Sequence, residues 1–99
     1  MSDEINYSTM PNRGMQYGIQ NYLEHGQPVG GFLTALLSND LKETCSRADS
    51  TNAQLIYEWV KWLYNNAPGS AWGSPQRVAE WMSHRGLEFK LREEEDDHE

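Results

Sequence analysis

The stretch TNAQLIYEWVKWLYNNA, residues 51–67, decides the fold. Its apolar residues recur at the i, i+3, i+4 and i+7 spacing of a helix with one buried face; they are Leu55, Ile56, Trp59, Val60 and Leu63. Thr51 with Gln54 fits a capping box at the start, although Asp49 and Ser50 could cap the helix equally well. Pro68-Gly69 ends the helix. A helix this apolar needs cover from other helices.

Three further helices are predicted around it. The first spans residues 15–25 and ends at Gly26. The second spans residues 32–47, with Leu33, Leu37, Leu41 and Cys45 on its apolar face, so we expect Cys45 to be buried. The segment Ser38-Asn39-Asp40 in its middle implies a kink or a partner, because short polar side chains compete for backbone hydrogen bonds. The last helix begins with Ser74-Pro75 and stops at Gly86.

The fold class is therefore all-α, a compact bundle of about four helices. We expect a flexible arm over residues 1–13, the helical domain over 14–91 and a disordered acidic tail over 92–99. The net charge of −7 arises at the two ends, since residues 13–92 carry eight basic and seven acidic residues. The net charge of residues 13–92 is thus close to zero. This argues against a protein that binds along the phosphate backbone of a nucleic acid, because such binding needs a stripe of basic residues on the surface.

Several other classes are disfavoured. The apolar runs are too short to span a bilayer, so we expect no membrane segment. One cysteine forms no internal disulfide and fits a reducing cytosol. The three histidines have no second ligand at metal spacing, and GxSxG, P-loop and GxGxxG motifs are absent. We therefore expect no metal, no cofactor and no enzymatic activity.

Three features suit an anionic, aromatic ligand. The first is the helix start at Ser74, where free N–H groups, Arg77 and the ring of Trp72 could hold a phosphate and a base. The alternative is a plain N-cap with a solvated arginine.

The second feature is Tyr57, Lys61 and Tyr64, at i, i+4 and i+7 beside the core stripe. Two rings that flank an ammonium could stack on a base and hold a phosphate. The alternative is a half-buried stripe at a contact between subunits, with Lys61 extended between the rings.

The third feature is the junction of Arg47 and Asn52, next to the polar face that includes Asn39. These side chains could form hydrogen bonds with the polar edges of a ligand. The alternative is an Arg47–Asp49 ion pair that fixes the turn between helices.

Residues 17–87 resemble a family of small proteins encoded by tailed bacteriophages. The resemblance rests on the segments GGFLTALLSNDLKE (residues 30–43), RAD (47–49), LYNNAP (63–68) and WGSP (72–75). It implies a viral protein that acts in the cytoplasm of the host bacterium. Small phage proteins often inhibit host defence, and one class forms oligomers that sequester cyclic or ADP-ribose-like nucleotides. No residue role is carried over from the family.

Our first hypothesis is therefore an anti-defence binding protein that sequesters a nucleotide-derived immune signal in a pocket of a homo-oligomer. The richness in aromatic residues supports the oligomer, because a lone 99-residue chain has little room to bury them all. A second hypothesis is a protein-binding inhibitor of a bacterial defence factor. A third is a small enzyme that degrades the signal.

Overall fold

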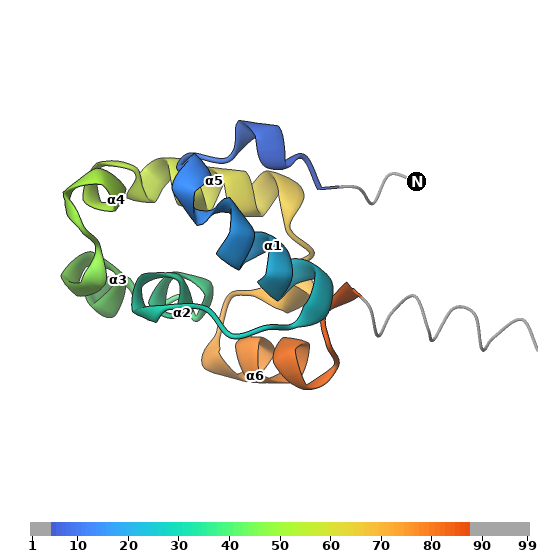
Figure 1. The fold of residues 1–99 in the computed structure, drawn as a ribbon. Coiled ribbons are helices and arrows are strands. Elements are labelled where there is room, and N and C mark those ends of the chain that lie inside the picture. Colours follow the sequence, from blue (N-terminus) through green and yellow to red (C-terminus); the bar gives the residue numbers. More distant parts are fainter. Residues whose placement is uncertain (1–4, 88–99) are drawn as a thin grey trace, which may run out of the picture.

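The computed structural model describes residues 5–87, so the predicted acidic tail and the last residues of the predicted domain lie outside it. The described part folds into α-helices and three short 3-10 turns, two before α1 and one between α5 and α6 (Figure 1). The α-helices are α1 Gln16–His25, α2 Gly31–Leu37, α3 Leu41–Arg47, α4 Ser50–Gln54, α5 Ile56–Asn66 and α6 Pro75–Ser83; the 3-10 turns are η1 Tyr7–Thr9, η2 Arg13–Met15 and η3 Gly69–Ala71. The all-α prediction is confirmed for these residues.

The core forms around α5, and α1 lies between α5 and α6 (Figure 1). Trp59 and Leu63 of α5 are fully buried, and Trp59 meets the rings of Phe32 and Trp62 edge-on at centroid distances of 6.3 Å. Edge-to-face contacts suit the ring quadrupoles and add to the free energy of burial. The same cluster includes Ile19, Tyr22, Leu23, Leu33, Leu36, Leu37, Val78 and Trp81.

The helix predicted over residues 32–47 is broken at its polar middle. Asn39 takes a left-handed φ of 64°, and the side chain of Asp40 caps the new helix α3 by accepting from the N–H of Glu43. The break turns the second half of the segment, so the four-residue apolar repeat loses its register. Leu41 and Cys45 are exposed and Thr44 is buried instead. The prediction that Cys45 is buried is wrong.

The central helix is also interrupted, at Leu55 between α4 and α5. Of the three expected cap candidates, Asp49 is the cap: it accepts from the N–H of Asn52 at 2.8 Å. Val60, predicted to be in the core, is 40% exposed, whereas Trp62 is buried. The two breaks explain why the described residues form six α-helices and not about four.

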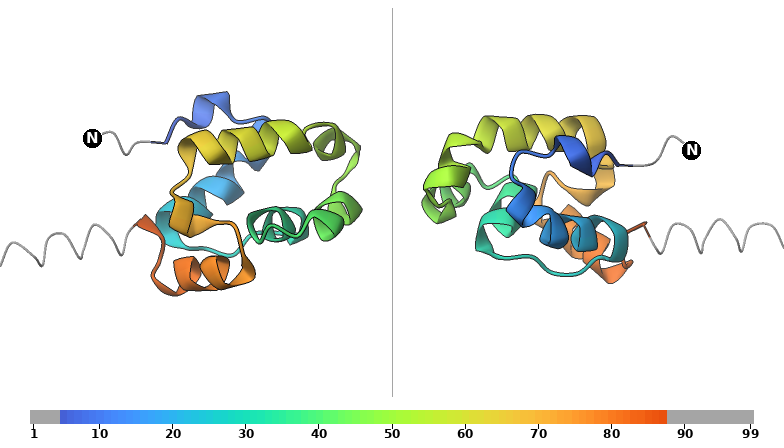
Figure 2. Two further views of the ribbon diagram at one scale, coloured as in Figure 1. Left: turned by 180° about the vertical axis from the view of Figure 1, so that it is seen from behind. Right: turned by 45° about the horizontal axis from the view of Figure 1, so that its top comes forward.

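Residues 5–13, expected to belong to a flexible arm, run along α5 (Figure 2). The indole N–H of Trp62 donates to the carbonyl of Asn6 and to Oγ1 of Thr9, both at 3.1 Å. The Tyr7 hydroxyl donates to Glu24 of α1, and Met10 is buried in the core. This segment therefore covers the side of α5 that carries Trp62.

The loop after α5 is tied to α1 and α2, and α6 is tied to α1. The Tyr22 hydroxyl donates to the carbonyl of Ala71 at 2.6 Å, and the Gly73 N–H donates to the carbonyl of Leu37 at 2.7 Å. The indole of Trp81 donates to the carbonyl of Tyr22. The predicted start of the last helix is confirmed, with Ser74 as N-cap and Pro75 in the first turn.

Gly86 packs directly on the end of α1 and has a φ of +63°. A Cβ at this position would lie 2.6 Å from the carbonyl oxygen of Leu23, whereas a Cβ at Gly69 would meet nothing. We expect Gly86→Ala to lower the free energy of unfolding by about 2–4 kcal/mol, from left-handed strain plus overlap. Gly69→Ala is the control, with an expected change within about 0.5 kcal/mol. Urea unfolding measures both, and equal effects would contradict the packing described.

Burial raises the pKa of the phenols of Tyr7 and Tyr22, and the nearby carboxylate of Glu24 adds to the rise for Tyr7. These protons are held more tightly in the folded chain, so their contribution to stability is complete below about pH 10 and is lost above it. We expect Tyr7→Phe to reduce the fall in unfolding free energy above pH 10 by up to ~1.4 kcal/mol per pH unit. Urea titrations at pH 8 to 11 test this, and an unchanged slope would contradict it.

Candidate functional site

One face of α5 is turned to solvent and carries large apolar side chains. Tyr57 is 71% exposed, Tyr64 is 80% exposed and Val60 lies between them. Lys61, also exposed, borders this row. We call these four residues the α5 outer face. Sequence reasoning missed Val60, although its spacing of three residues from Tyr57 and four from Tyr64 was the available signal.

The face is exposed because the opposite side of α5 packs against the core and the N-terminal segment. Trp59 and Leu63 point into the core, and Trp62 is bonded to residues 6–9. The 3.6-residue period then leaves Tyr57, Val60 and Tyr64 together on the remaining side. Exposed large aromatic side chains in a row are typical of contact surfaces, since tyrosine and tryptophan are enriched in interfaces.

The predicted anion site at the start of α6 is used internally. Nη1 of Arg77 donates to the carbonyls of Gly69 at 3.1 Å and of Trp72 at 3.3 Å. The Ser74 hydroxyl accepts from the N–H of Arg77, and Trp72 is half-buried against the core. The arginine thus closes the loop before its own helix, which explains a cation in the first turn without a bound anion.

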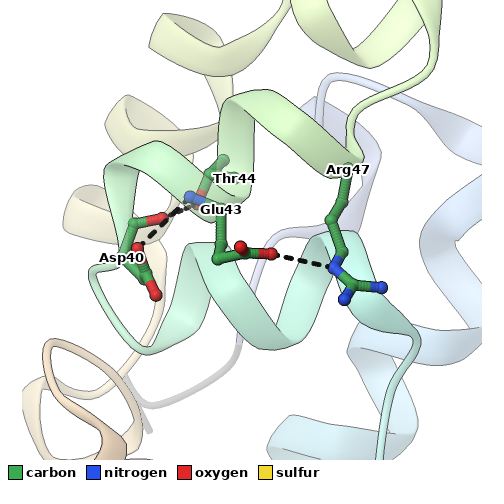
Figure 3. Close-up of polar contacts among 4 residues, drawn as sticks. All are labelled: Asp40, Glu43, Thr44 and Arg47. Atoms are coloured by element: carbon green, nitrogen blue, oxygen red, sulfur yellow. Dashed lines mark hydrogen bonds and ion pairs between the residues drawn. The ribbon is translucent and has the colours of Figure 1, made fainter.

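Arg47 is held by a different carboxylate from the one expected. Its Nε donates to Glu43 at 3.0 Å, one turn earlier in α3 (Figure 3). Asp49 instead caps α4. The Arg47 side chain also lies over Gly31, where a Cβ would be 2.9 Å from its Cδ. The contact leaves an open depression of about 460 Å³, lined by Gly31, Phe32, Glu43, Ser46 and Arg47.

The other two predicted ligand residues have roles within the chain. Asn52 is 3% exposed, and its Oδ1 accepts from the Trp59 indole and from Asn12, both at 3.1 Å. Asn39 is exposed and provides the left-handed turn between α2 and α3. Asn52, buried and with its side-chain oxygen accepting two hydrogen bonds, is a core residue in this structure.

The three predicted features are not brought together. Tyr57, Lys61 and Tyr64 lie on α5, while Ser74 and Arg77 begin α6 beyond α1, and Arg47 ends α3 (Figures 1 and 2). Within residues 5–87 no group of three or more His, Cys, Asp or Glu side chains could hold a metal ion. Among the helices described, none is long and apolar enough to cross a membrane.

No protein-family model, curated protein or solved structure matches this chain.

Asn52 supplies the acceptor for a buried indole N–H, so its loss leaves that donor without a partner. We expect Asn52→Ala to lower the free energy of unfolding by about 1–3 kcal/mol. Asn65→Ala is the matched control, because Asn65 is exposed and bonds only the carbonyl of Lys61 among the described residues; its expected effect is within about 0.5 kcal/mol. Chemical denaturation decides between them, and an Asn52 variant as stable as the wild type would contradict the core role.

Proposed function

We propose that this protein acts by binding another polypeptide through the α5 outer face. The observation that carries the proposal is the exposure of Tyr57 and Tyr64 on one side of a helix whose opposite side is firmly packed. A rigid helix that presents side chains at i, i+3 and i+7 matches the way amphipathic helices dock into grooves. Tyrosine adds contact area with few rotatable bonds to immobilise.

The charges favour a polypeptide over a nucleotide as the occupant. A nucleotide phosphate needs several donors, yet Arg77 and Arg47 are bonded to groups of this chain. Lys61 is the one cation on the α5 outer face. A protein surface needs mainly apolar contact and a few polar ones, which this face offers.

The phage resemblance suggests the setting. On this proposal the protein is made in the bacterial cytoplasm during infection. Its target is a host defence protein, which it inhibits by binding to it and blocking the bound surface. The proposed action needs no catalytic group.

A nucleotide sponge is the second candidate, and one observation favours it. Lys61 stands between Tyr57 and Tyr64 at i, i+4 and i+7, all three exposed. A base could stack on a tyrosine while the ammonium holds a phosphate. Because one convex helix face cannot enclose a ligand, this candidate requires a pocket between copies of the chain.

Site-specific photo-crosslinking tests the proposal in living bacteria. We expect p-benzoyl-phenylalanine at position 64 to crosslink a bacterial protein, whereas the same group at Tyr17 should not. Tyr17 is the matched control because it is 84% exposed but lies on α1. Equal crosslinking from both positions, or none from position 64, would overturn the proposal.

The sponge has a separate readout. Thermal melting with cyclic dinucleotides and ADP-ribose derivatives at 100 times the dissociation constant should add ~2.7 kcal/mol of stability if it is correct. The shift should vanish in Tyr57→Ser/Tyr64→Ser and persist in Tyr17→Ser. No shift with the wild type would remove this candidate.

A further inference from the structure

Residues 5–9 cover the side of α5 that carries Trp62, and they are attached to the helices through side chains (Figure 2). Among residues 5–87, no backbone–backbone hydrogen bond joins this segment to an α-helix. The hydrogen bonds that hold it each use at least one side-chain atom; they join Asn6 and Thr9 to Trp62, Tyr7 to Glu24, and the N–H of Asn6 to Oδ1 of Asn66 at 3.3 Å. The segment can therefore leave α5 without breaking the backbone hydrogen bonds of any α-helix.

The segment also has weak hydrogen bonds of its own. The backbone hydrogen bonds of η1 measure 3.3 and 3.4 Å between nitrogen and oxygen, whereas those at the two ends of α5 measure 2.8 Å. None of residues 5–9 is fully buried, and Tyr7 is half-buried against Trp62, with ring centroids 5.9 Å apart. Segments with long hydrogen bonds and little buried apolar surface open at a lower free energy than the core.

The chain is fixed from Met10 onward. Met10 is 6% exposed and belongs to the core cluster. Two residues later, the side chain of Asn12 donates to the buried Asn52 of α4 at 3.1 Å. These two anchors leave residues 5–9 as the part of the N-terminal segment that can move.

We propose that residues 5–9 form a strap that opens from α5 as one unit while the core stays folded, and that opening uncovers Trp62. In the closed form Trp62 is 4% exposed, and both acceptors of its indole N–H lie on the strap. The indoles of Trp59 and Trp81 donate instead to groups of α4 and α1, so they stay covered when the strap opens. The strap thus changes the exposure of one core tryptophan and leaves the other two in place.

The strap is separate from the α5 outer face. Trp62 and Val60 lie two residues apart on one helix, so they point to nearly opposite sides. The strap therefore opens or closes without touching the surface proposed for the target, and the inference does not depend on that target. Opening adds a tryptophan ring and its indole donor to the solvent-exposed surface, and so changes which aromatic side chains the protein offers to solvent.

Hydrogen exchange of the indole N–H groups of the full chain, measured by NMR, tests the strap. In the wild type the Trp62 N–H should exchange about tenfold or more faster than the Trp59 N–H, because strap opening costs less than opening the core. Val78→Ala removes buried methyl groups from α6, on the other side of α1 from α5 (Figure 1). It should raise the Trp59 rate about tenfold or more and leave the Trp62 rate within about twofold. Urea well below the unfolding midpoint should act on the wild type in the same way, since strap opening exposes little surface.

Tyr7→Phe tests whether the strap moves as one unit. It removes the bond to Glu24 but leaves both acceptors of the Trp62 indole in place. It should therefore raise the Trp62 exchange rate about fivefold. Tyr17→Phe is the matched control, because it removes the hydroxyl of a tyrosine that is 84% exposed. It should leave the Trp62 rate within about twofold.

Each comparison has an outcome that overturns the inference. Equal rates for Trp62 and Trp59 in the wild type, or a parallel rise of both in Val78→Ala, would mean that residues 5–9 open only when the core unfolds. Equal effects of Tyr7→Phe and Tyr17→Phe on the Trp62 rate would mean that the strap does not open as one unit.

Discussion

The hydrogen bond between the buried Trp59 indole and Asn52 is the contact on which the rest of the structure depends. It joins α4 to α5 across the interruption at Leu55 and fixes the rotation of α5 about its axis. Asn52 also accepts from Asn12, which ties the N-terminal segment to the same point. Because the Trp59 indole and the Asn52 side-chain oxygen are buried and hydrogen-bonded to each other, another rotation of α5 would leave polar groups unpaired in the core.

The outward side of α5 follows from this constraint. With Trp59 in the core and Trp62 bonded to residues 6–9, the helix has one side left for solvent. That side carries two tyrosines, a valine and a lysine where a monomer of this size would more simply carry charged residues. The exposure of these side chains is thus a consequence of packing elsewhere, and the proposed binding surface rests on this exposure.

The sequence predicted the helix starts and stops well where a single residue determines them. Ser74-Pro75 and Gly26 are such signals, since a side-chain cap and a left-handed turn are local properties. At residues 32–47 it was right in part: the expected kink at Ser38-Asn39-Asp40 is present as a full break between two helices. The four-residue apolar repeat did not show that this break turns Cys45 outward. Of the candidate site, the row of Tyr57, Lys61 and Tyr64 could be predicted from the sequence, because residues at i, i+4 and i+7 of one helix share a face. The hydrogen bonds of Arg77 and Asn52 could not be predicted in this way, since their partners come from a loop and from a distant segment. The Arg47–Glu43 pair is a local i,i+4 contact that the spacing could have indicated.

The most direct test of the account is hydroxyl-radical footprinting of the tyrosines in dilute protein, read by mass spectrometry. The account predicts that Tyr57 and Tyr64 react as readily as the exposed Tyr17, while the buried Tyr22 is protected. Protection of Tyr57 and Tyr64 to the level of Tyr22 would contradict it.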